Sequence, residues 1–272
     1  MGRTLYLSET ERFKALADGP SIWIDWANKA SQRIPLRLIS RCIIIGNISI
    51  DTELISLLAN HNIPIIFTNS SGYELAITLP YNHRLPKHWK EQKVFLESKK
   101  NRERYLCWVK LKRMTLQLKV LKKLMPRKSG QLSFDIGEGD YQIYLKPFKP
   151  KNEELWRVVK NFINNLMRGI IIEKINQVGL NLNQGIMHRY HNFGLVLDIG
   201  YILEPVIDEQ SLQFFKQKSF LPLLEKKGNN WSLTKEGLKS IIHRFENKKE
   251  EVESSLDNIL DEFFDLMREL GS

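Results

Sequence analysis

The sequence has little cysteine and no long apolar run, and both features limit the classes of protein to which it can belong. Only two cysteines occur, Cys42 and Cys107, far apart and without a CxxC spacing. This spacing argues against a disulfide framework or a zinc ribbon and favours a reducing cytoplasm. No stretch approaches the roughly 18 apolar residues of a membrane-spanning helix, and the N-terminus lacks the apolar core of a signal peptide. We therefore expect a soluble, cytoplasmic protein with no membrane partner.

Repeats and low-complexity tracts are also missing, and the composition is that of a globular protein. The 272 residues are 42% hydrophobic and 10% aromatic. A chain of this length can bury a sizeable core in one or two domains.

Positive charge is concentrated in one segment of the chain. The formal net charge is +10, but residues 84–128 alone hold sixteen Lys or Arg and three acids, a local charge of +13. A basic stripe of this kind is typical of proteins that bind a polyanion, because each neutralised phosphate releases condensed counterions. A solvated helix face that only keeps the protein in solution is the alternative. The charge alone favours a nucleic-acid partner.

The first 79 residues favour a small β-sheet unit. Runs rich in β-branched and aromatic residues predict strands over 4–7, 21–26, 33–39, 41–45, 64–68 and 74–79. One helix is expected between them, with Asp51 as its N-cap. Residues 80–88 hold two prolines and no apolar period, which indicates a linker.

From residue 89 onward the pattern is helical. Apolar residues from Trp108 to Leu124 keep a three- and four-residue spacing, and Pro126 ends that helix. Further helices are predicted over 152–178, 195–215, 234–247 and 250–270. The sequence thus predicts an α+β protein. A small N-terminal β-sheet domain (1–79) and a linker (80–88) precede a larger all-α domain (89–272).

A few polar residues in this second part could bind a metal ion. A glycine-punctuated turn ends in His188, and Asp198 begins an apolar helical run ten residues later. Upstream, Glu138 stands alone between two glycines. Carboxylates with one imidazole are a ligand set for Mg²⁺ or Mn²⁺, and such an ion stabilises charge on a phosphodiester. A histidine that serves only the packing of its own loop is the structural alternative.

Four motifs, in order, resemble a known family. The stretch RTLYL (3–7) resembles its first strand, and PLRLI followed by IIGN (35–47) resembles its central sheet segment. The stretch GLNLNQGIMH (179–188) resembles its glycine-histidine motif, and WSLTKEG with a later FE (231–246) resembles its C-terminal motif. The family is the CRISPR-associated endonuclease-integrase, the universal core subunit of the complex that captures new spacers.

The resemblance implies a metal site made by a glutamate, a histidine and a third acid. The family glutamate falls on Glu138 and the family histidine on His188. The third acid lies three residues after the position of Asp198, and this chain has Tyr201 there. A phenol with a reference pKa of about 10 is a poor ligand for a hard cation near neutral pH. Asp198, one helical turn before, is the first substitute that we expect, and Glu204, one turn after, is the second.

Together these features predict a metal-dependent DNA endonuclease-integrase. Mg²⁺ or Mn²⁺ held by Glu138, His188 and Asp198 is expected to polarise a phosphate of a CRISPR repeat, which the 3′-hydroxyl of a captured fragment attacks. A catalytically decayed DNA-binding scaffold of the same fold is the alternative, because of Tyr201. A basic RNA-binding protein outside CRISPR is a more distant one.

Three partners are implied: double-stranded DNA (prespacer and CRISPR repeat), a second copy of the chain in a homodimer formed through the β domain, and a small second adaptation subunit. We expect the basic stripe to contact the DNA backbone and to hold the duplex without reading its sequence. The residues assigned to them are Arg84, Lys112, Arg113, Lys119, Lys122, Lys123 and Arg127.

Overall fold

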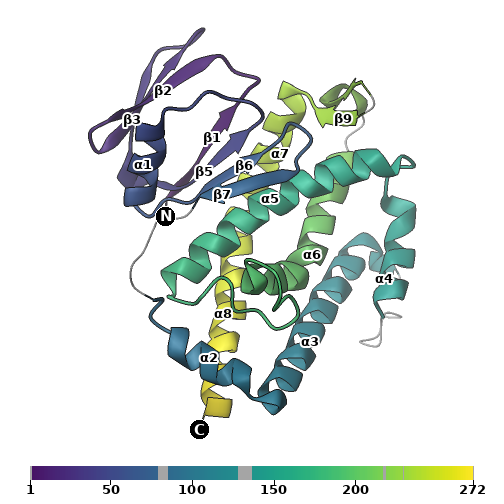
Figure 1. The fold of residues 1–272 in the computed structure, drawn as a ribbon. Helices are drawn as coiled ribbons and strands as arrows, with labels where there is room; N and C mark the ends of the chain where they lie inside the picture. The colour runs from purple at the N-terminus through teal and green to yellow at the C-terminus, as the bar shows by residue number, and fades with distance from the viewer. Residues whose placement is uncertain (1, 79–84, 128–136, 217–218, 229, 272) are drawn as a thin grey trace.

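The chain folds into a small β-rich unit followed by a larger, mainly helical unit (Figure 1). The computed structural model describes residues 2–78, 85–127, 137–216, 219–228 and 230–271. The α+β prediction, with the sheet region first, is confirmed. Most of the expected linker lies outside the described residues, so the domain boundary at 80–88 stays a prediction.

Two sheets make up the β-rich unit. The larger has the order β1 (Arg3–Ser8), β5 (Ile39–Ile45), β6 (Ile65–Thr68) and β7 (Glu74–Thr78). Its first three strands run parallel, and β7 is antiparallel to β6. The smaller is the antiparallel β2 (Phe13–Asp18), β3 (Ser21–Trp26) and β4 (Gln32–Pro35). Helix α1 (Thr52–Asn60) connects β5 to β6 and has the predicted N-cap, Asp51.

Strand β5 is buried on both faces and thereby joins the two units. Cys42 and Ile44 pack into a core between the two sheets and α1, whereas Ile43 and Ile45 pack into the core of the helical unit. Successive side chains of a strand point to opposite faces, so a strand covered on both sides has a continuous apolar run. The sheet therefore shares its core with helix α5 (Glu153–Gln177).

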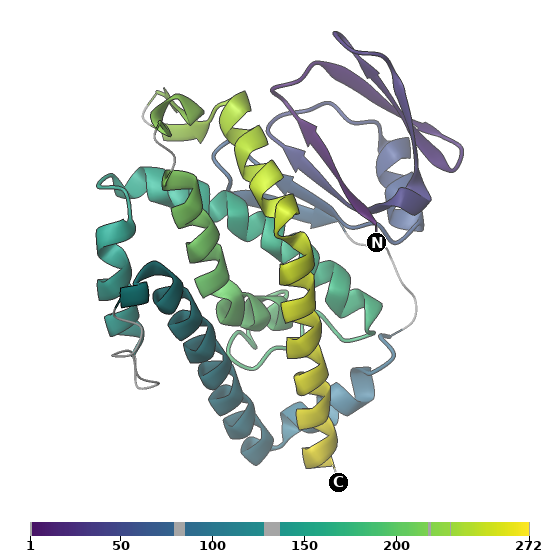
Figure 2. The ribbon, with the colours of Figure 1, turned by 180° about the vertical axis from the view of Figure 1, so that it is seen from behind.

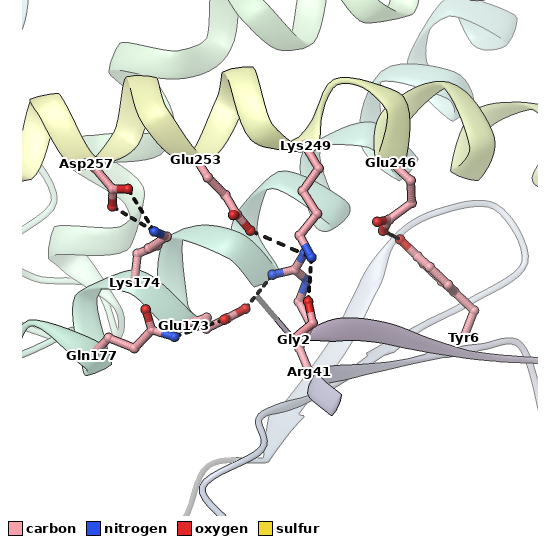
Figure 3. A network of polar contacts seen from close by, with 10 residues as sticks. All are labelled: Gly2, Tyr6, Arg41, Glu173, Lys174, Gln177, Glu246, Lys249, Glu253 and Asp257. Atoms are coloured by element: carbon pink, nitrogen blue, oxygen red, sulfur yellow. Dashed lines mark hydrogen bonds and ion pairs between the residues drawn. The ribbon is translucent and has the colours of Figure 1, made fainter. Parts of the chain in front are cut away.

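Polar contacts reinforce this junction (Figure 3). Arg41 on β5 is 1% exposed, and its guanidinium forms an ion pair with Glu173 on α5. At the end of the same sheet, Lys249 Nζ donates to the carbonyl of Gly2 at 2.8 Å. A buried charge that loses its partner is strongly destabilising. These contacts therefore favour one orientation of the sheet on the helices.

The four helices predicted over 152–178, 195–215, 234–247 and 250–270 lie within a residue or two of those ranges, whereas the helical pattern from residue 89 is divided into two helices at Ser98. The long helices are α2 (Trp89–Glu97), α3 (Lys99–Leu124), α5, α6 (Gly194–Phe215), α7 (Lys235–Asn247) and α8 (Lys249–Gly271). Helix α6 packs between α5 and α3, while α7 and α8 follow each other across the face seen in Figure 2. Ser98, Asn152 and Thr234 cap α3, α5 and α7 through their side chains. None of the described helices is long and apolar enough to cross a membrane.

Several short elements differ from the prediction. A 3₁₀ turn over Leu36–Leu38 interrupts the strand predicted over 33–39. Strand β2 was not predicted, because alanines at every second position give a weak strand signal. The hairpin β8 (Leu224–Lys227) and β9 (Asn230–Leu233) lies in the part expected to be all-α, so that description was wrong. Its four-residue strands are too polar to form an apolar run. Helix α4 (Glu138–Leu145) was not predicted either, because the two glycines at its start, Gly137 and Gly139, have a low helix propensity.

Candidate functional site

The loop between α5 and α6 is closely packed on its own glycines. Gly179, which follows the end of α5, has a φ of 73°, a conformation that glycine adopts without strain. Gly185 lies against the backbone of Gly194, the first residue of α6, and a Cβ at Gly185 would collide with it. A Cβ at Gly194 would in turn lie 2.8 Å from the carbonyl oxygen of His188. These close approaches bring His188 back over the start of α6.

Asp198 is the buried acceptor at the centre of this loop. The residue is 0% exposed. Its Oδ2 accepts hydrogen bonds from the backbone N–H of Ile186 at 2.7 Å and of Met187 at 3.2 Å, and from Tyr105 Oη at 3.1 Å. Its Oδ1 accepts the N–H of His188 at 3.1 Å and lies 2.7 Å from His188 Nδ1. Asp198 thus fixes both the loop and the imidazole.

The predicted pair of His188 and Asp198 comes together, with different roles. Both oxygens of Asp198 are occupied, so a direct contact with a metal ion would require it to give up a bond. His188 has 32% of its side chain exposed, and no described residue bonds to its Nε2. An imidazole oriented by a carboxylate through one nitrogen is typical of histidines that bind a metal or transfer a proton through the other.

Gln92 of α2 anchors the same loop and was not predicted. It is 0% exposed. Its Nε2 donates to the carbonyls of Asn181 at 3.2 Å and Gln184 at 3.0 Å, and its Oε1 accepts the N–H of Asn181 at 2.8 Å. A glutamine in a charged helix has no sequence signature of such a role, because its partners are backbone groups far along the chain.

His188 borders a pocket between α5 and α6. The pocket has a volume of about 200 Å³. Its polar lining residues are Lys160, Asn161, Asn164, Arg168, His188, Tyr201 and Glu204. Cationic and amide side chains on α5 suit an anionic group such as a phosphate oxygen.

Two cations neutralise two acids of α6 beside this pocket. Glu204 Oε1 lies 2.6 Å from Lys160 Nζ, and its Oε2 lies 2.7 Å from a guanidinium nitrogen of Arg113. Lys160 Nζ also lies 2.8 Å from Oδ1 of Asp208, whose side chain is 1% exposed. Tyr141 of α4 donates to Asp208 Oδ2 at 3.3 Å. Glu204, the second candidate ligand, therefore has both oxygens paired.

Burial and pairing shift the pKa values of this cluster. Burial disfavours the charged form of Glu204, but Lys160 and Arg113 outweigh it and hold the pKa of Glu204 below its ordinary value. Burial also opposes the charge on Lys160, but the two acids raise its pKa. For Asp208 burial is the largest effect, and it raises the pKa although Lys160 opposes the rise.

Tyr201, at the position of the third family acid, lies beneath a guanidinium group. The carbon at the centre of the Arg113 guanidinium is 4.0 Å from the centroid of the Tyr201 ring, a cation–π contact. Arg113 also donates to the carbonyl of Tyr201. Arg113 is only 4% exposed, so its assignment to DNA contact was wrong, because it lies on the face of α3 that packs against α6.

Glu138 is the first residue of α4, and its side chain lies outside the described part of the structure. Tyr141, one turn later on the same helix, reaches Asp208 on α6, so the start of α4 approaches the acids of the pocket. A contact between Glu138 and a metal ion stays a prediction.

The described side chains do not by themselves complete a divalent-metal site. His188 Nε2 is a suitable ligand. Asp198, however, has both oxygens occupied, Tyr201 offers a phenol, and Glu204 is held by two cations. Among the described residues there is no group of three His, Cys, Asp or Glu that could hold an ion. Mg²⁺ or Mn²⁺ stays a prediction, and we assign no reaction step to it.

The basic stripe is partly neutralised by acids of α6 and α8. Ion pairs join Lys112 to Glu262 at 2.6 Å, Lys119 to Glu251 at 3.9 Å and Lys123 to Glu209 at 2.9 Å. Lys122 and Arg127 are exposed, and neither forms an ion pair with a described acid. Arg84 lies outside the described residues. The positive charge left for a polyanion on α3 is thus smaller than the sequence indicates.

Comparisons with known proteins agree with this fold. A family model described as CRISPR associated protein Cas1 matches residues 6–139 and 158–247. No curated protein sequence matches the chain.

Among solved structures, a Cas1 protein from Thermotoga maritima matches with a TM-score of 0.80 at 16% identity, over 98% of this chain and 97% of that one. A casposase bound to integration product matches with a TM-score of 0.72 at 18% identity, over 90% and 82% of the two chains. A Cas6-RT-Cas1–Cas2 complex matches with a TM-score of 0.72 at 13% identity, over 91% of this chain and 32% of that one. Since the family model covers most of the sequence, including Glu138 and His188, the chain belongs to the CRISPR-associated Cas1 family.

Proposed function

We propose that this chain is the integrase subunit of CRISPR spacer acquisition, which joins captured DNA fragments to a CRISPR repeat. One observation supports a catalytic role most directly: a buried carboxylate orients the imidazole of His188 at a pocket lined by cations and amides. The loop is already held by three backbone hydrogen bonds to Asp198. The imidazole adds little to that packing, and its exposure suits contact with a substrate.

The proposed reaction is a transesterification. The 3′-oxygen of the fragment forms a bond to a phosphorus atom of the repeat, and the bond from that phosphorus to the 3′-oxygen of the preceding nucleotide breaks. The proton lost by the attacking hydroxyl is balanced by one gained by the leaving 3′-oxygen. Water in place of the 3′-hydroxyl gives the nuclease reaction. His188 Nε2 is left to contact the reacting phosphate, because Nδ1 is bonded to Asp198.

The proposed partners are double-stranded DNA, a second copy of the chain and a small second adaptation subunit. The casposase among the similar structures is bound to an integration product, and another similar chain belongs to a complex that contains Cas2. Of the residues assigned to DNA contact, Lys122 and Arg127 are exposed on α3 and just after it without an ion pair to a described acid, and we propose them for backbone contacts.

A DNA-binding member without strand-joining activity is the second candidate. Tyr201 in place of an acid and the paired oxygens of Glu204 favour it.

A strand-joining assay with Mg²⁺ or Mn²⁺ separates the two candidates. We expect joining by the natural protein, loss of joining in His188→Ala, and unchanged DNA affinity in that variant. His191→Ala is the matched control, since His191 is an exposed histidine of the same loop with its ring 5.9 Å from that of His188. Equal joining by His188→Ala would contradict the role of His188. DNA binding without joining by the natural protein would support the scaffold.

A further inference from the structure

Glu204 and Asp208 lie one turn apart on α6, and a single ammonium group bridges them. Lys160 Nζ is 2.6 Å from an oxygen of Glu204 and 2.8 Å from an oxygen of Asp208. Carboxylate oxygens on one helix face, beside a histidine in the same pocket, are also what a divalent cation binds. The lysine thus occupies the space between two acids where an ion would otherwise bridge them.

We infer that Lys160 and Arg113 are the resident cations of this acidic cluster and exclude a divalent ion from it in the free protein. Among the described side chains the cluster holds two carboxylates and two cationic groups, and the formal charges of these four groups cancel. An added divalent ion would leave two positive charges uncompensated beside a buried aspartate, which is costly. The ion would also have to displace Lys160 or Arg113 from an oxygen of Glu204.

Tyr201 is consistent with the same charge balance. Its neutral ring lies under Arg113 and provides a π face to the guanidinium without adding a third negative charge. An aspartate at this position would give three acids against two cations among the described side chains, and the added negative charge would favour an ion. The loss of the family acid and the presence of the ion pairs therefore belong together. This inference concerns the free protein and does not depend on whether the chain joins DNA.

Mn²⁺ binding followed by electron paramagnetic resonance, on full-length protein without DNA, tests the inference. The natural protein is expected to bind no more Mn²⁺ than its His188→Ala variant. Combining Lys160→Met with Tyr201→Asp is expected to raise Mn²⁺ affinity about 10- to 100-fold, the range over which ligand surroundings change metal affinity. Adding His188→Ala or Glu204→Gln to the double variant is expected to abolish the gain.

Lys174→Met is the matched control. Lys174 is another ion-paired lysine of α5, with its Nζ 2.8 Å from Asp257, but it does not line the pocket. Its loss is expected to leave Mn²⁺ binding unchanged.

Two results would overturn the inference. One is Mn²⁺ binding by the natural protein that disappears in His188→Ala. The other is a double variant that melts cooperatively and still binds Mn²⁺ no better than the natural protein. If the double variant does not fold, Lys160→Gln alone carries the test, because it removes a resident cation and keeps a polar side chain between the two acids. An unchanged Mn²⁺ affinity in folded Lys160→Gln protein then overturns the inference. Strand joining is measured separately, so failure of the proposed function is distinguishable from each of these results.

Discussion

At the scale of single residues, Asp198 determines the conformation of the His188 loop. Three backbone N–H groups, a tyrosine hydroxyl and an imidazole all converge on its two oxygens. An amide in its place offers only one acceptor oxygen and directs an N–H₂ group at donors. We expect Asp198→Asn to lower the free energy of unfolding by roughly 3 kcal/mol, because buried donors lose a charged acceptor.

Urea denaturation of Asp198→Asn and of Asp257→Asn would check this expectation. Asp257 forms an ion pair with Lys174 but has 49% of its side chain exposed, so the Asp257→Asn variant should lose at most about 1 kcal/mol. Equal losses in the two variants would show that burial of Asp198 is not the source of its effect.

Glu204 gives a prediction about pH at the same scale. Its pKa is held below the ordinary value by Lys160 and Arg113, despite burial. The stabilisation is therefore fully present above the unfolded value of about 4.3 and is lost as the pH falls through the lower folded value. Between pH 7 and 3 we expect the natural protein to lose more stability than Glu204→Gln. Denaturation midpoints at several pH values measure this, and parallel curves would contradict it.

At the scale of elements, tertiary contacts of helix α3 reduce the positive charge that its basic residues can offer to DNA. Lys119 and Lys123 face acids of α6 and α8, whereas Lys122 faces solvent, and so does Arg127 just beyond the helix. We expect Lys122→Glu with Arg127→Glu to weaken DNA binding and to make its salt dependence shallower. The slope should change by about one unit for each phosphate that the variant no longer neutralises.

Binding isotherms at several salt concentrations measure this slope. The control is Lys14→Glu, a charge reversal at an exposed residue of β2. A slope that is unchanged in the α3 double variant would indicate a solvated face with no part in DNA binding.

Helix α2 and the His188 loop are linked as elements through Gln92. Replacing Gln92 by leucine keeps a similar volume but removes three hydrogen bonds to the loop. We expect faster hydrogen exchange at the amides of residues 181–188 and unchanged exchange within α8, because only the loop loses partners. Mass spectrometry measures the exchange. An increase in exchange rate that is the same along the whole chain would indicate global destabilisation instead.

Long elements were predictable from the sequence, and short or polar ones were not. Helices α5 to α8 repeat an apolar spacing over many turns, so their ranges were predicted to within a residue or two. The strands of the β8–β9 hairpin are four residues each and mostly polar, and helix α4 begins between glycines. Such segments are fixed by their surroundings more than by their own pattern.

The candidate site was predictable only in part. Family motifs pointed to His188 and Asp198, which the structure brings together. The pairing of Lys160 and Arg113 with Glu204 joins three different helices. A charge in a single sequence does not show which distant charge it will meet, so this network could not be predicted.

At the scale of the whole molecule, the β-rich unit and the helices share buried polar contacts as well as a common core. Arg41→Met is expected to lower the free energy of unfolding by roughly 3 kcal/mol, because it leaves Glu173 without its buried partner. Adding Glu173→Met should restore part of this stability. Chemical denaturation of the two single variants and the double variant measures the coupling. Effects that simply add would show that the two residues act independently.

Helix α5 runs without a break past both the pocket and the sheet, with Lys160 and Glu173 thirteen residues apart on it. At about 1.5 Å per residue, roughly 20 Å of rigid helix separates these two positions. There is no proline within it and no irregular turn to absorb a displacement. A shift of the sheet against Glu173 is therefore expected to move α5 as one body, and with it the lysine beside His188.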